Sequence, residues 1–276
     1  MALSNSSSAQ LRSSALTAVR GATWRNNLRL MRNSASLVSA LVIPGMSMLA
    51  FWVVFGHAAS GSGFDYALFL MAAAMFQAVM FTAGGSAMAL AVDVESGLLA
   101  RVRAMPVHVL SVIMGRMICD LIRSILSLCT VIALGLLCGA EPASWSGLAL
   151  AFLVALAMGE VLVLVFSGLA LRSRQPVQMA GLIQGVELPL LMVSTAFIPL
   201  STLPDRLEPL IAHMPFSPMI DTNRALLNGE TPAWLATTGV FLGLLIIAGI
   251  VLAIAGVYCY LSWTKTRYAV SNTAIW

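Results

Sequence analysis

The stretch that decides the fold of this chain is residues 66–91, YALFLMAAAMFQAVMFTAGGSAMALA, which contain no charged side chain. A helix needs about 20 mostly apolar residues to cross the hydrocarbon core of a bilayer, so this stretch is long enough to do so. Apolar residues fill its odd and even positions alike, which excludes the two-residue alternation of a membrane barrel strand. The stretch therefore predicts a transmembrane helix.

The composition of the whole chain agrees with a membrane protein. Of the 276 residues, 59% are hydrophobic and 9% are charged, whereas about 25% of residues are charged in a typical soluble domain. The mean hydropathy of +0.92 implies more apolar surface than a single protein interior could bury. A water-soluble globular domain is therefore excluded, and lipid is the expected solvent.

Five further apolar stretches have the length of a membrane span. They cover residues 37–55, 117–138, 148–171, 179–198 and 238–261. Together with 66–91 they predict an all-α membrane protein with six transmembrane helices in a domain over residues 37–261. Pro44 and Pro189 fall inside two of these stretches, and we expect them to bend the helices.

The basic residues predict how the chain is oriented in the membrane. All 15 Lys and Arg residues except Arg206 and Arg224 lie in segments on one side of the six spans or, for Arg123, just inside the third span near that side. The positive-inside rule places this side in the cytoplasm. Both ends of the chain, residues 1–36 and 262–276, are therefore expected to be cytoplasmic.

Three segments outside the spans have distinct patterns. In residues 1–36 a basic and an apolar stripe run side by side at helical spacing, formed by Arg25, Arg29 and Arg32 and by Trp24, Leu28 and Met31. This pattern is typical of a helix that lies along the membrane surface. The polar stretch 93–108 predicts a short cytoplasmic helix that Pro106 ends. The proline-rich stretch 199–235 holds apolar pieces too short to cross and predicts an external, partly re-entrant hairpin.

The chain lacks the motifs of an ATPase and of the enzymes considered. Its only lysine, Lys265, follows no glycine-rich stretch, so the chain has no P-loop with which to hold ATP. Its histidines show no H-E-x-x-H spacing, so we expect no metal site. Gly84-Gly85-Ser86 has no histidine at matching depth in a neighbouring span, which gives little support to an intramembrane serine hydrolase. No catalytic residues are predicted.

Two loops carry a resemblance to a known family. In residues 94–107, VESGLLARVRAMPV, an acidic residue, a glycine, two apolar residues, a basic residue and a proline follow in this order. In residues 197–229, several prolines are followed by Asp221, Arg224 and Gly229. Both patterns resemble the corresponding loops of type-2 ATP-binding cassette exporter permeases. The first looks closest to the daunorubicin-resistance-like branch, which exports hydrophobic drugs or long lipids.

The resemblance implies a half-transporter whose ATPase is a different chain. It implies a second membrane subunit, identical or homologous, and two ATPase subunits that bind ATP and magnesium, while this chain binds no cofactor. The coupling helix that contacts the ATPase would comprise Glu95, Gly97, Leu98, Leu99, Arg101, Val102, Arg103, Met105 and Pro106. The elbow helix on the inner membrane surface would comprise Trp24, Arg25, Leu28, Arg29 and Arg32. The implied location is the bacterial plasma membrane.

The residues of the coupling segment also suit a protein contact on physical grounds. Gly97 permits close approach, Leu98, Leu99 and Val102 offer an apolar ridge, and two arginines flank it. The alternative is a solvated loop whose arginines only follow the charge topology.

Charged residues within the spans have two interpretations each. Arg116, Asp120 and Arg123 share one face of the third span and would either form ion pairs that anchor it at the inner interface or relay ATPase motion into it. Glu160 and Glu187 fall near the centres of two spans, where a carboxylate costs about 2.5–3.5 kcal/mol and should face protein or a cavity. They would either bond between helices, with Gln184 as a candidate partner, or contact substrate and take part in the conformational switch.

We therefore expect a membrane-spanning subunit of an ATP-driven exporter that moves a hydrophobic drug or a lipid out of the cytoplasm or the inner leaflet. The alternative is an ATPase-independent ion or small-solute channel, or a membrane assembly factor. The sequence leaves the substrate and the identity of the second membrane subunit open. It predicts no contact with nucleic acid, because the charge is low and dispersed.

Overall fold

A computed structural model describes residues 34–59, 65–98, 109–196 and 216–230. The regular elements in these residues are all helices: α2 (Ser34–Ala59), α3 (Tyr66–Glu95), α5 (Val109–Leu137), α6 (Trp145–Arg172), α7 (Pro176–Val193) and α9 (Ser217–Leu227). Among the described residues, four segments are long and apolar enough to cross a membrane: Tyr66–Glu95, Gly115–Leu137, Trp145–Arg172 and Pro176–Val193. The all-α membrane class is therefore confirmed.

Several predictions concern residues outside the described part of the chain. These are the sixth span at 238–261, the cytoplasmic tail, the elbow helix and most of the coupling helix. The affected site residues are Leu99, Arg101, Val102, Arg103, Met105, Pro106, Trp24, Arg25, Leu28, Arg29 and Arg32. The first predicted span, 37–55, lies within α2.

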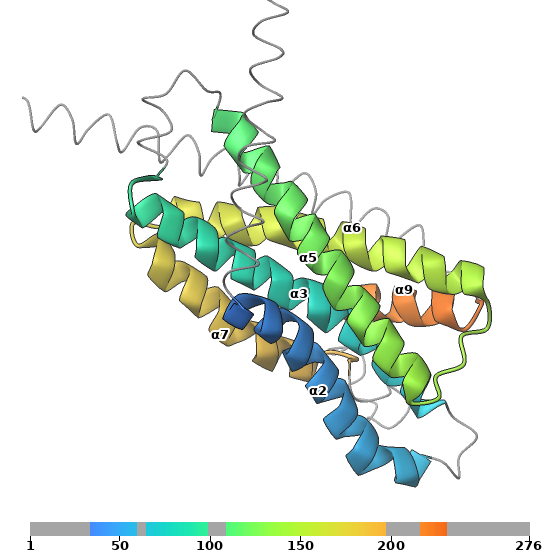
Figure 1. The fold of residues 1–276 in the computed structure, drawn as a ribbon. Coiled ribbons are helices and arrows are strands. Elements are labelled where there is room, and N and C mark those ends of the chain that lie inside the picture. Colours follow the sequence, from blue (N-terminus) through green and yellow to red (C-terminus); the bar gives the residue numbers. More distant parts are fainter. Residues whose placement is uncertain (1–33, 60–64, 99–108, 197–215, 231–276) are drawn as a thin grey trace, which may run out of the picture.

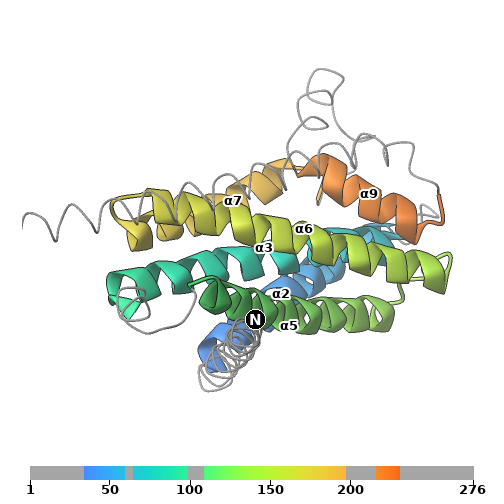
Figure 2. The ribbon, with the colours of Figure 1, turned by 90° about the horizontal axis from the view of Figure 1, so that it is seen from above.

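Helix α3 lies at the centre of the bundle, and α2, α5, α6, α7 and α9 all pack against it (Figures 1 and 2). Its sequence explains this place, because small and apolar residues occupy every face and leave no polar face for water. Neighbouring helices reach it closely through glycines. A Cβ atom at Gly159 of α6 would lie 2.7 Å from the Cβ of Val79, and one at Gly135 of α5 would lie 2.8 Å from the Cγ of Met71.

Helices α7 and α9 lie end to end along α3 and α6 (Figure 2). With 18 residues, α7 is about 27 Å long, against about 45 Å for the 30 residues of α3. It ends at Val193, although the apolar stretch predicted as the fifth span continues to residue 198. The 11 residues of α9 continue the same path beside the first half of α3, where the ring of Phe216 lies 5.4 Å from that of Phe76.

The end of the bundle where α3 begins is closed by capping hydrogen bonds. The Asp65 carboxylate accepts one bond from the Leu68 N–H and another from the Glu141 N–H, at 2.8 and 3.0 Å, so it caps α3 and holds the α5–α6 connection. The Ala143 N–H donates to the Leu227 carbonyl at 2.9 Å, which ties the same connection to the end of α9. By the predicted topology this end is external.

Candidate functional site

Polar side chains of α5 lie buried against the second half of α3. Arg116 donates from Nη1 to the Asp93 carboxylate and from Nη2 to the Ser86 backbone carbonyl, both at 2.9 Å. The Ser86 hydroxyl donates to the Asp120 carboxylate. Charge-assisted bonds of this kind are the stronger hydrogen bonds in proteins, and burial strengthens them. They join the two helices at fixed positions along both axes.

Arg123 extends this contact toward the middle of α3. Its Nη2 donates to the Thr82 carbonyl and lies 4.0 Å from Oδ1 of Asp120. Arg123 and Asp120 are only 5% and 6% exposed. Gly85 makes room for the guanidinium, because a Cβ there would lie 3.0 Å from Nη2. The three residues on one face of the third span therefore all point at α3. We refer to Ser86, Asp93, Arg116, Asp120 and Arg123 as the polar cluster.

The Glu187 side chain of α7 packs into α3 at Gly84. A Cβ on Gly84 would lie 2.8 Å from the carboxyl carbon of Glu187 and nearer still to one of its oxygens. Glu187 is 2% exposed, and neither carboxylate oxygen has a hydrogen-bond partner among the described residues. Gly84 and Gly85 thus give adjacent α3 positions at which a charged side chain from α7 and one from α5 approach the backbone.

Glu160 and Gln184 occupy less specific positions. Glu160 lies on α6, where its Oε1 is buried without a hydrogen-bond partner in the described part of the chain. Gln184 is half-buried on α7, and the described residues show no hydrogen bond from it to either glutamate. Of these three residues, only Glu187 packs against a defined position of α3, at Gly84.

The end of α3 carries the start of the predicted coupling segment. Glu95 is the last helical residue, and its Oε1 accepts a 3.1 Å hydrogen bond from the Val177 N–H in the first turn of α7. Gly97 has a φ of +73°, a backbone conformation that favours glycine and that turns the chain out of the helix. Leu98 is half-buried just beyond this turn.

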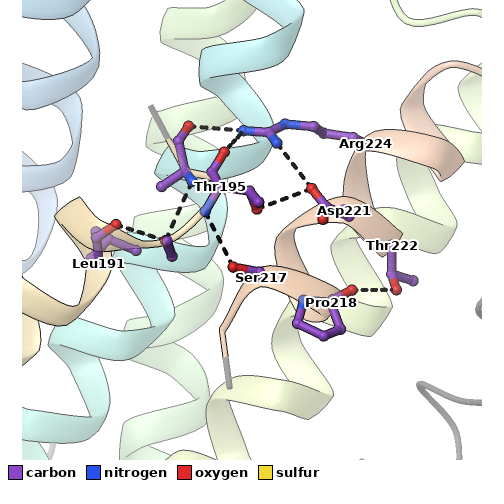
Figure 3. A network of polar contacts seen from close by, with 9 residues as sticks. Leu191, Thr195, Ser217, Pro218, Asp221, Thr222 and Arg224 are labelled. Carbon is purple, nitrogen blue, oxygen red and sulfur yellow. Dashed lines mark hydrogen bonds and ion pairs between the residues drawn. The ribbon is translucent and has the colours of Figure 1, made fainter. Parts of the chain in front are cut away.

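A second network joins the end of α7 to α9 (Figure 3). Arg224 donates from Nη2 to the carbonyls of Thr195 and Ala196, at 2.6 and 2.8 Å, and from Nη1 to Asp221 at 3.0 Å. The Thr195 hydroxyl also donates to Asp221, and its N–H donates to the Ser217 hydroxyl. Irregular backbone deep in a membrane protein needs such partners, because lipid offers none. Arg224 therefore satisfies the backbone where α7 ends.

These arrangements suit the transmission of motion better than catalysis. The arginines bind backbone carbonyls as well as carboxylates, so each fixes the height and rotation of one helix against another. A displacement of either end of α3 must then be shared by its neighbours. Among the described residues, no group of three His, Cys, Asp or Glu side chains could hold a metal ion.

Comparison with known proteins identifies the family of this chain. Residues 17–228 match the ABC-2 type transporter family. The chain belongs to this family. The match covers every described helix. As an ABC-2 permease, the chain is a membrane component of a transporter, and the family implies an ATPase partner and usually a second membrane subunit.

Two relatives of this ABC-2 permease share much of its length. A daunorubicin resistance ABC transporter permease protein of Streptomyces coeruleorubidus is 26% identical over 224 residues, which are 81% of this chain and 79% of the relative. A probable doxorubicin resistance ABC transporter permease protein of Mycobacterium tuberculosis is 25% identical over 204 residues, 73% of each chain. The resemblance to the daunorubicin-resistance-like branch is thereby confirmed.

Sequence reasoning missed several residues of the permease's polar contacts. Asp93 pairs with Arg116, and the available signal is a carboxylate at the end of one span and an arginine at the start of the next. From the sequence, Gly84-Gly85-Ser86 suggests only a hydrolase motif. The structure gives all three a packing or bonding role against α5 and α7, for which pairs of small residues in a span are a usable signal.

Proposed function

We propose that this ABC-2 permease is the membrane subunit of an ATP-driven exporter of hydrophobic drugs in the bacterial plasma membrane. The observation that carries the proposal is the family match over residues 17–228, together with relatives named for daunorubicin and doxorubicin resistance. Lipids remain the second substrate class that the sequence resemblance implied. The absence of a P-loop from the sequence supports a separate ATPase chain that holds ATP and magnesium.

The geometry supports a coupling role for the segment that begins at Glu95. The turn at Gly97 follows the end of α3 at its predicted cytoplasmic end. The apolar ridge that begins with Leu98 then contacts one of two ATPase subunits. A second membrane subunit, identical or homologous, contacts the other ATPase subunit. ATP binding to the closed form of the ATPases supplies the drive, because a ligand shifts a conformational equilibrium only by its differential affinity.

The polar cluster and the two intramembrane glutamates belong to the moving part in this proposal. Charge-assisted bonds join α3 to α5, and Glu187 joins α7 to α3 by close packing at Gly84. The helices therefore move as a unit when the coupling segment is displaced. Glu160 and Glu187 take part in the switch between conformations, and replacing either by Gln is expected to lower export while assembly with the ATPase is retained.

The first experiment tests the ATPase contact. The permease is co-expressed with an ATP-binding cassette ATPase subunit of the same organism, and recovery of the ATPase with the purified permease is measured. Leu98→Asp should abolish recovery of the ATPase, because the contact would then bury a charge without a partner. Leu137→Asp is the matched control, since Leu137 is 83% exposed at the other end of the bundle. Equal recovery for both variants would contradict the proposed contact.

The second experiment tests transport and separates the exporter from its rival. Permease and ATPase are reconstituted in liposomes, and movement of doxorubicin is followed by its fluorescence. ATP-dependent movement that requires both proteins supports the exporter. Movement of ions or doxorubicin through the permease alone, unaffected by ATP, would instead support the channel.

A further inference from the structure

We propose that Glu95 transmits motion of the coupling segment to α7, as a positioning residue, and does not itself bind the ATPase. This inference deepens the proposed function and rests on it, because an ATPase must move the segment beyond Gly97. It differs from the assignment by family resemblance, which places Glu95 among the residues that contact the ATPase. The evidence is the bond that Glu95 makes within its own chain.

The Glu95 carboxylate supplies a cap that α7 does not supply for itself. The first N–H groups of a helix have no partner inside the helix. In α7 the N-cap residue Gln175 makes no side-chain capping bond, and Pro176 has no N–H to donate. The Val177 N–H is instead satisfied by Glu95, at 3.1 Å. The negative carboxylate also lies at the positive end of the α7 dipole, which stabilises the contact.

The same turn of α3 holds a second helix on another side. Asp93, two residues before Glu95, binds Arg116 of α5 at 2.9 Å. Ala91, Ala170 and Ala180 are fully buried together, so the ends of α3, α6 and α7 lie at short separation. A displacement of the chain beyond Gly97 therefore reaches α5 through Asp93 and α7 through Glu95. Since α7 carries Glu187 and leads to the α9 network, Glu95 links the two ends of the bundle.

The test uses the permease–ATPase complex with three variants. Glu95→Ala removes the contact, and Glu95→Gln keeps an oxygen acceptor without the charge, which guards against a variant that fails to fold. Glu141→Ala is the matched control, because Glu141 is an exposed glutamate at the other end of the bundle that contacts Asp65 through its backbone N–H and not through its carboxylate, among the described residues. Five quantities are measured: ATPase recovery, melting temperature, kcat for doxorubicin export, KM for doxorubicin export, and ATP hydrolysed per drug moved.

For Glu95→Ala we expect normal ATPase recovery, an unchanged KM, and a kcat lower by roughly fivefold or more, the range typical of coupling between sites. The number of ATP molecules hydrolysed per drug molecule moved should rise, since the ATPase still hydrolyses ATP but its motion is transmitted to α7 less effectively. Glu95→Gln should lie between this variant and the wild type. Loss of ATPase recovery in Glu95→Ala would overturn the inference, because Glu95 would then be an ATPase contact. Export equal to the wild type would overturn it too.

A fourth variant separates transmission from simple helix capping. In Glu95→Ala/Gln175→Asp, the new aspartate at the N-cap gives α7 a cap of its own, with no link to α3. Compared with Glu95→Ala, we expect this double variant to regain the melting temperature of the wild type while its kcat stays low. Recovery of both would show that Glu95 only caps α7 and would overturn the inference. The proposed function fails separately, if the unmodified permease retains no ATPase.

Discussion

Gly159→Ala is the substitution that most directly tests how α6 packs on α3. The added Cβ would lie 2.7 Å from the Cβ of Val79 and 3.2 Å from its Cγ1. Carbon atoms pack best at about 3.5–4.0 Å, so the two backbones must separate. Val79 is fully buried and its Cβ is fixed to the α3 backbone, so a rotamer change cannot relieve the contact.

The expected magnitude follows from two opposing effects. Overpacking of a tight core costs about 1–3 kcal/mol, whereas replacing glycine by alanine inside a helix gains about 1 kcal/mol. The net loss is therefore up to about 2 kcal/mol, which lowers the melting temperature of a chain of this size by up to about 4–8 °C. The melting temperature of the purified permease in detergent is the measurement.

Gly185→Ala is the control for Gly159→Ala, because apart from the backbone of its own helix turn no atom of the described residues lies within 4 Å of a Cβ at that helical position. It should leave the melting temperature equal or raise it. Val79→Gly/Gly159→Ala moves the bulk from α3 to α6 and should show a favourable coupling energy in a double-mutant cycle. A Gly159→Ala protein as stable as Gly185→Ala would refute the close α3–α6 packing.

Two further predictions concern Arg116 and Arg224, whose side chains are both 15% exposed. Arg116→Met leaves Asp93 buried without its cation and should destabilise the permease by about 3 kcal/mol, whereas adding Asp93→Asn should recover much of this, as judged by melting temperature. An additive double variant would contradict this pairing. Arg224→Lys replaces the planar guanidinium by a single ammonium nitrogen, which cannot hydrogen-bond to the carbonyls of Thr195 and Ala196 and to the Asp221 carboxylate in the same geometry. We therefore expect the free energy of unfolding to fall by about 2 kcal/mol, as judged in the same assay. A melting temperature within error of the wild type would show that the junction does not need the guanidinium.

The spans and the charged face of the third span were predictable from local pattern, whereas their partners were not. Arg116, Asp120 and Arg123 repeat at helical spacing, which any helix turns into one face. The side chain that Arg116 binds, Asp93, is 23 residues away, beyond a loop whose length leaves many pairings open. Glu95 likewise looked like a loop charge available to a partner, because its bond to Val177 spans 82 residues.

The amino-acid sequence by itself determined that this is a helical membrane protein with no nucleotide-binding loop of its own, since both conclusions depend only on local composition. The tertiary structure alone decided that α3 is the central helix, because lipid is as apolar as a protein core and an apolar stretch looks the same in either. It alone also decided where α7 breaks. The stretch predicted as a span continues to residue 198, and beyond the end of α7 the carbonyls of Thr195 and Ala196 are satisfied by Arg224, 29 and 28 residues further along the chain.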